Sequence, residues 1–228
     1  MLKRIVSVVL CLVLLIGCVA CSRNKGVSPD GLVPGTYDVS HPQFEELRQY
    51  YFDYFWDMYG VQHLTTNKEG KYNDKDALTF AFTYLSRGLG VNINEGVTRE
   101  QLNEITNKYL GYTIEKFDTS ISMVNTVNDK VHLSEFITDY FGDLFVLQSL
   151  VVKKDGTHQG VFHRCDLPEY FWENTNIADP FQKLAKGDYA SFGNEITVTP
   201  TRVIFNVLVD KETDKQYLKV TTIKEQTV

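Results

Sequence analysis

The chain of 228 residues is poor in cysteine and has only one long hydrophobic run, which lies at its N-terminus. Four cysteines, three of them within the first 21 residues, are too few for a disulfide framework. No later segment offers the roughly 20 consecutive apolar residues that a membrane-spanning helix needs. Nothing after the N-terminal run is therefore expected to cross a bilayer.

Basic residues are outnumbered by acidic ones, and the formal net charge is −6. Removal of the first 17 residues would take away Lys3 and Arg4 and leave a charge of −8. Proteins bind nucleic acid through basic stripes that displace counterions, and here only short pairs such as Lys153-Lys154 occur. We expect no nucleic-acid partner.

Motifs of catalysis and cofactor binding are missing as well. The chain has no G-x-S-x-G, no G-x-x-x-x-G-K-S/T, no G-x-G-x-x-G and no D-x-D-x-D-G calcium loop. The sequence therefore predicts no cofactor and no metal, and it favours a non-enzymatic role over an enzymatic one.

What the sequence does contain at its start is the pattern of an export signal. Lys3 and Arg4 form a positive region, and residues 5–16 are apolar except for Ser7. This run is too short to span a bilayer as a helix. It predicts a signal peptide at residues 1–17.

The end of this signal, Leu15-Ile16-Gly17-Cys18, resembles the lipobox of bacterial lipoproteins. The resemblance implies cleavage before Cys18, acylation of Cys18 with palmitate among its lipids, and anchoring of the body outside the cytoplasm on the cell membrane or envelope. Cys21, preceded by Val19-Ala20, is an alternative acylation site. Whether Cys21 pairs with Cys165 is left open.

Residues 18–40 are rich in glycine and proline and predict a flexible tether. Residues 41–228 are expected to form a single domain, helical over 41–117 and mainly β over 118–228. The first helix is predicted to begin with Ser40 as its cap and to end near Gly60, and the second to cover 74–87 with Gly88 in a left-handed cap. The third opens with a capping box of Thr98 and Gln101.

The second half of the chain carries strand and turn signals. Asp155-Gly156 predicts a hairpin between strands over 145–153 and 159–165. Further strands are predicted over 196–199, 202–209 and 216–224, with a short helix over 179–186. Residues 134–141 fit a helix or a strand. Helices followed by an antiparallel β-meander define an α+β fold, for which cystatin-like and NTF2-like folds are analogues that carry no function.

Three groups of residues are candidates for a chemical site. Asp53 and Asp57 share a helix face and could act as paired acids or calcium ligands, but without a calcium loop the pattern favours a solvated acidic face. His163 and Cys165 would share one face of a strand and His158 the other, which leaves too few ligands for a structural zinc.

The third group is aromatic. Residues 50–59 contain seven aromatic side chains, and only some fit the core stripe of a helix. We predict that Phe52, Trp56, Tyr59 and Trp172 form a binding surface; the alternative is a helix buried on both sides.

These observations favour a lipid-anchored cell-envelope protein whose domain binds a protein or a glycan. The alternative is an envelope hydrolase that uses carboxylates such as Asp53 and Asp57, or His163. A solute-binding subunit of a transporter fits less well, because its two lobes require alternating β and α elements.

Overall fold

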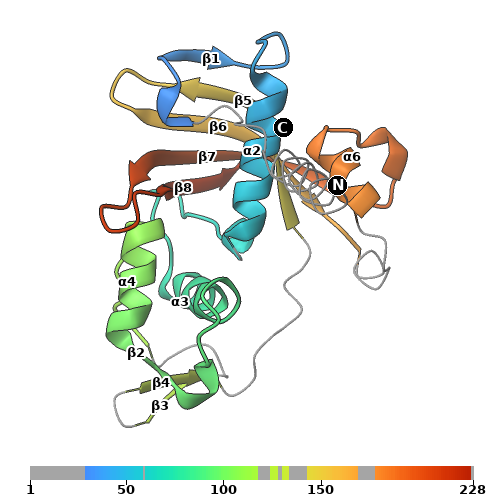
Figure 1. Cartoon of the computed structure of the whole chain (residues 1–228). Coiled ribbons are helices and arrows are strands. Elements are labelled where there is room, and N and C mark those ends of the chain that lie inside the picture. The colour runs from blue at the N-terminus through green and yellow to red at the C-terminus, as the bar shows by residue number, and fades with distance from the viewer. Residues whose placement is uncertain are drawn as a thin grey trace, which may run out of the picture.

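The computed structural model describes residues 29–58, 60–117, 124–127, 130–133, 143–168 and 178–226 (Figure 1). The α-helices of these residues are α2 (Phe44–Asp57), α3 (Asp74–Thr83), α4 (Arg99–Tyr109) and α6 (Ala178–Ala185). The strands are β1 (Gly35–Tyr37), β2 (Val97–Thr98), β3 (Val124–Val127), β4 (Lys130–Leu133), β5 (Asp143–Val152), β6 (Thr157–Asp166), β7 (Thr197–Val209) and β8 (Gln216–Glu225). None of the helices in these ranges has the length and apolar character needed to cross a membrane.

The larger sheet has the order β1-β5-β6-β7-β8, and each neighbouring pair is antiparallel. A smaller sheet has the order β2-β4-β3. Figure 1 shows α2 lying across the larger sheet, with α3 and α4 between that sheet and the smaller one. The predicted α+β class is confirmed, and the analogy with cystatin-like and NTF2-like folds stays a prediction.

The Asp155-Gly156 turn joins β5 to β6 as the sequence predicted. Gly156 adopts a φ of 80°, and the Asp155 carboxylate accepts a hydrogen bond of 2.9 Å from the Thr157 amide. β7 is one strand where two were predicted. It continues through Pro200 because pairing with β8 begins only at Thr201, so no ladder bond on that side needs the missing proline N–H.

The core is built where α2 meets the larger sheet. Phe55 of α2 is fully buried, and its ring lies 5.3 Å from that of Phe145, 5.2 Å from that of Phe162 and 6.3 Å from that of Phe205. All three pairs are edge-to-face, the arrangement that aromatic rings prefer. The same buried cluster continues into α3, α4 and the smaller sheet, so one core joins the helices to both sheets.

The folded region begins before residue 41, where the sequence placed the end of the tether. Gly35–Tyr37 forms β1, which pairs with Leu150, Val151 and Val152 of β5. Ser40 does not cap the first helix either. Its amide and hydroxyl both donate to Asp38, and α2 starts later, with Gln43 at its N-cap and no side-chain cap.

The second helix does not stay α-helical to Arg87. α3 ends at Thr83 and continues as a π-turn over Tyr84–Gly88, and the left-handed residue is Gly90 rather than Gly88. Such single π-turns are rare in α-helices. Here the Tyr84 hydroxyl lies 2.7 Å from that of Tyr109 in α4.

The capping box of the third helix is confirmed. The Thr98 hydroxyl accepts from the Gln101 amide at 3.1 Å, and the Gln101 side chain accepts from the Thr98 amide at 3.0 Å. Two amide groups at the helix start thereby find partners.

The outer edge of β8 is covered by side chains from elsewhere in the fold. The Leu218 amide donates to the Tyr54 hydroxyl at 2.7 Å, and the Tyr72 hydroxyl donates to the Val220 carbonyl at 3.0 Å. Thr66 donates to the Ile223 carbonyl through both its amide and its hydroxyl. These bonds occupy backbone groups that an open sheet edge would leave unpaired.

Candidate functional site

The predicted aromatic surface is partly buried in the structure. Phe52 is only 6% exposed and packs in a second cluster with Leu144, Val146 and residues of α6. Its ring therefore fills the contact between α2 and α6 and is not part of an exposed surface. Trp56 is half-buried, with its ring 4.9 Å from that of Phe181 in α6. Tyr59, Trp172 and the acylation candidate Cys18 lie outside the described residues.

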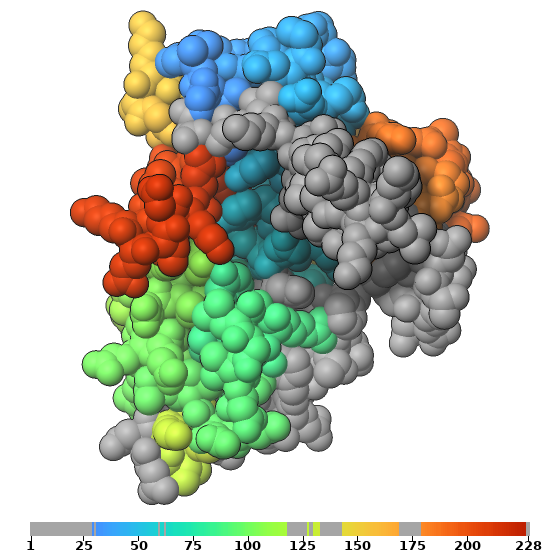
Figure 2. All heavy atoms as spheres, viewed as in Figure 1, coloured from blue at the N-terminus to red at the C-terminus, as the bar shows by residue number. Residues whose placement is uncertain are grey.

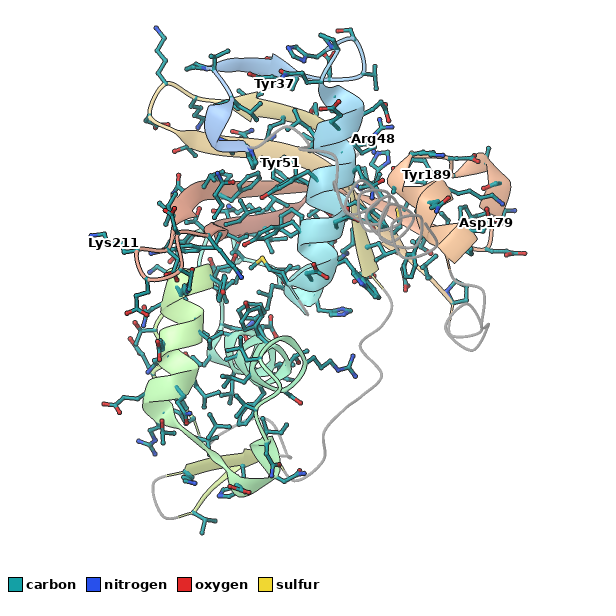
Figure 3. All side chains as sticks on the ribbon, in the orientation of Figure 1. Tyr37, Arg48, Tyr51, Asp179, Tyr189 and Lys211 are labelled. Atoms are coloured by element: carbon teal, nitrogen blue, oxygen red, sulfur yellow. The ribbon has the colours of Figure 1, made fainter. Side chains whose placement is uncertain are left out.

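Arg48 fixes α6 to α2 and to the edge of β5. It is 6% exposed, its Nε donates to the Leu147 carbonyl at 3.1 Å, and its Nη1 donates to the Lys186 carbonyl at 2.8 Å. Lys186 directly follows α6, so the arginine cation lies at the negative end of that helix. Figure 3 shows Arg48 and Tyr189 on the α6 side of α2 and Tyr51 on the side of the strands.

The acidic face of α2 lies in solvent. Asp53 and Asp57 are both exposed, and Asp53 accepts a hydrogen bond of 2.8 Å from Gln49. Within the described ranges, no group of three or more histidine, cysteine and acidic residues is placed to hold a metal ion. The solvated-face interpretation fits this geometry.

The strand β6 separates its histidines as predicted. His158 is buried on the side of α2, 3.3 Å from the Tyr51 hydroxyl, and burial lowers its pKa. His163 and Cys165 share the other face, near Tyr189. Burial lowers the pKa of His163, and the charge of Arg48 lowers it further.

Cys165 is unsuited to act as a nucleophile. It is fully buried, and burial raises the pKa of its thiol to about 12, with a further contribution from Asp143. The thiol points at the His163 carbonyl, 3.8 Å away, rather than at an imidazole nitrogen. A thiolate is needed for nucleophilic attack, so this pair favours packing over catalysis.

A pocket of about 100 Å³ lies between α3 and the turn that follows α2. Gly60, at a φ of 90°, turns the chain into the short 3-10 helix η2 (Val61–His63), which forms one wall. Leu64 and Phe80 are buried and supply apolar lining. The polar lining consists of His63, Lys75, Asp76, Thr79 and Thr83.

The α3 wall of this pocket presents hydrogen-bonding groups at helical spacing. The hydroxyls of Thr79 and Thr83 donate to the Lys75 and Thr79 carbonyls, at 3.0 and 2.9 Å. Their oxygens keep lone pairs that can accept from a ligand. Asp76 accepts from the Asn73 side chain at 2.7 Å, while Lys75 is exposed.

His63 is connected to the sheet by a chain of charged side chains. Its Nδ1 lies 3.4 Å from Asp143 Oδ2, and the same oxygen lies 3.7 Å from Arg164 Nε. Arg164 also pairs with Glu225 at the end of β8. A carboxylate beside one ring nitrogen fixes the orientation of an imidazole, so His63 is held in place at the pocket wall.

Sequence reasoning did not identify this pocket. His63, Asp143 and Arg164 come from η2, β5 and β6, and no short motif connects them. Only Thr79 and Thr83, one turn apart on the predicted second helix, carried a local signal, and a polar helix face explains them equally well.

No protein-family model matches this chain, and no curated protein or solved structure matches it either.

Proposed function

We propose that this chain is a membrane-anchored cell-envelope lipoprotein whose domain binds a glycan, or a side chain of a protein, in the pocket between η2 and α3. The observation that carries the proposal is the mixed lining of that pocket. Leu64 and Phe80 offer apolar contact, and the polar side chains around them offer both donors and acceptors. Ligand sites commonly combine an apolar lining with a few placed polar groups.

A sugar ring suits this lining because it has an apolar face and a rim of hydroxyls. Lys75 donates, Asp76 accepts, and the Thr79 and Thr83 oxygens accept. The pocket is smaller than the roughly 300 Å³ or more of typical drug-sized ligand sites. It therefore fits one terminal ring or one side chain rather than an extended chain.

Binding is expected to depend on Lys75 and Thr79. The double variant Lys75→Ala/Thr79→Val removes one donor and one acceptor, which should weaken binding by roughly tenfold or more. The measurement is a titration with a panel of mono- and disaccharides and short peptides, in which binding is monitored through changes in the amide chemical shifts. Lys154→Ala, at an exposed lysine in the β5–β6 turn and outside the pocket lining, is the control and should bind as the unmodified protein does. Equal binding by the double variant would contradict the proposed site.

The His63–Asp143 pair favours a second candidate, a hydrolase that uses the same pocket. A histidine oriented by a carboxylate is the arrangement of a general base. Asp53, Asp57 and His163 do not line this pocket, so they would not take part. His63→Gln distinguishes the two candidates. A hydrolase should hydrolyse a bound glycan, and this variant should lose the hydrolysis while it still binds the glycan. A binding protein should show no hydrolysis with or without the substitution.

The anchor is tested at Cys18. Cys18→Ser should move the protein from the membrane fraction to the soluble fraction, because the thiol that receives the lipid is gone. Mass spectrometry of the mature N-terminus should find acyl chains on Cys18. Cys21→Ser is the matched control and should stay in the membrane fraction. If Cys21→Ser were soluble while Cys18→Ser stayed in the membrane fraction, Cys21 would be the anchored residue instead.

A further inference from the structure

Three exposed valines lie on either side of β1 or on its partner strand β5. Six large hydrophobic residues are exposed among the described ones, and three of them are Val33 at 68%, Val39 at 76% and Val151 at 38%. Val33 and Val39 flank β1, and Val151 pairs with Thr36 in its middle. Leu89, Val127 and Val209, the other three, belong to separate elements.

The first described element, the 3-10 helix η1 (Pro29–Gly31), precedes β1 in the chain and contacts β7. Figure 1 places β1 and the β5–β6 hairpin together at one end, and Figure 2 shows them at the same end in space-filling form. The pocket lies at the other end of α2, since Gly60 and His63 follow that helix. At about 1.5 Å per residue, the helix alone separates the two ends by roughly 21 Å.

The chain between the anchor and the domain is short. Ten residues lie between Cys18 and Pro29, the first described residue, and the eleven steps from one Cα to the other reach at most about 40 Å when the chain is fully extended. A domain of this size has a diameter of about 40 Å. If the far end of the domain faced the membrane, the segment between Cys18 and Pro29 would have to stretch to nearly its full length along the domain, which is entropically unfavourable.

We infer that the β1 end, defined by Val33, Val39, Val151 and Thr36, rests on the lipid surface, so that the pocket faces away from the membrane. This inference rests on the proposed anchor at Cys18. Apolar side chains that are exposed to water are stabilised when they enter the boundary between headgroups and acyl chains.

The charges at this end are mixed and add little attraction. Lys153 and Lys154 are exposed in the β5–β6 turn, but Asp38 and Asp155 lie at the same end. Both carboxylates accept local hydrogen bonds, from Ser40 and Thr157, which lower their pKa values, so they stay ionised at neutral pH. The valines therefore carry the contact, and raising the salt concentration should change it little.

The test places a nitroxide on the acylated full-length protein in vesicles of phosphatidylethanolamine and phosphatidylglycerol. The label is attached at Thr36→Cys or, as the control, at Leu89→Cys, in a Cys21→Ser background; Cys165 is fully buried. Power saturation compares collisions with oxygen, which enters the bilayer, and with a water-soluble nickel complex. We expect the ratio of oxygen collisions to nickel collisions to be about threefold or more higher for the label at Thr36 than for the label at Leu89.

A second pair of variants separates orientation from folding. Val33→Asp/Val39→Asp/Val151→Asp changes only exposed side chains and should return the Thr36 label to the aqueous ratio while the protein stays anchored. Leu89→Asp/Val127→Asp/Val209→Asp should leave that ratio unchanged.

An anchored, acylated protein whose Thr36 label matches the Leu89 label overturns the inference and leaves the anchor standing. Protection of Thr36 that appears equally in detergent, together with a dimer on size-exclusion chromatography, also overturns it in favour of a second copy on β1. A mature protein without acyl chains overturns the anchor, and the orientation with it.

Discussion

Replacing Phe55 with alanine is expected to lower the free energy of unfolding by about 4 kcal/mol. Phe55 is fully buried, and its ring contacts three phenylalanines of β5, β6 and β7. The truncation removes the edge-to-face pairs and leaves a cavity between α2 and the sheet. Since domains are stable by only about 5–15 kcal/mol, the variant should be close to unfolding at physiological temperature.

Urea denaturation followed by circular dichroism measures this effect. The midpoint should fall while the slope stays the same, because the native surface changes little. Phe55→Leu keeps most of the volume and should lose about 1.5 kcal/mol. Asp53→Ala, exposed on the same helix, should change stability by no more than about 0.5 kcal/mol. A loss below about 1 kcal/mol in Phe55→Ala would contradict a core centred on this ring.

Replacing Arg48 with methionine is expected to lower the free energy of unfolding by about 3 kcal/mol. Methionine keeps the unbranched apolar stem of the side chain, but it is shorter and lacks the donors to the Leu147 and Lys186 carbonyls, which then lose their partner. The ion pair with Glu45 adds little, since the Glu45 side chain is 67% exposed. α6 should also open more readily, because its C-terminal end loses the cation that holds it.

Hydrogen exchange of the α6 amides measures the local part of this effect. Arg48→Met should speed exchange in α6 more than in β7. Arg48→Lys keeps the charge, but a lysine ammonium cannot donate to both the Leu147 and the Lys186 carbonyl in the arginine geometry. We therefore expect an intermediate loss of about 1–2 kcal/mol in the free energy of unfolding. If Arg48→Met left α6 exchange unchanged, Arg48 would not be what fixes this helix.

Much of the fold was predictable from local signals. The capping box of Thr98 and Gln101 and the turn at Asp155-Gly156 appear in the structure because a few neighbouring residues suffice to form them. The strands of the meander followed from β-branched and aromatic residues between turn signals. The α+β class needed no more than the order of these elements.

The misplaced boundaries share a non-local cause. Gly35–Tyr37 has no alternating pattern of its own and becomes a strand because β5 offers it a partner. Phe52 was left over from the single core stripe of α2, and a helix buried on both sides was the alternative to an exposed surface. The structure supports that alternative for Phe52, since α6 packs on the side opposite the main core, but the periodicity of α2 alone could not identify α6 as the partner.

The candidate site was less predictable than the fold. His63, Asp143 and Arg164 meet only because the meander brings the start of β5 and the end of β6 beside the turn after α2. Their residue types occur throughout the chain, so no spacing distinguished them. Cys165 illustrates the converse, since a cysteine two residues from a histidine suggested chemistry that its burial makes unfavourable.

The covered edge of β8 matters most for molecules that share a surface. Proteins confined to two dimensions meet their neighbours far more often than the same number in solution, and an open strand would let one sheet continue into the next. Tyr54, Thr66 and Tyr72 already occupy the Leu218 amide and the Val220 and Ile223 carbonyls. If the proposed lipid anchor holds these domains side by side on a membrane, they should therefore remain separate molecules, with no fibril growing from this edge.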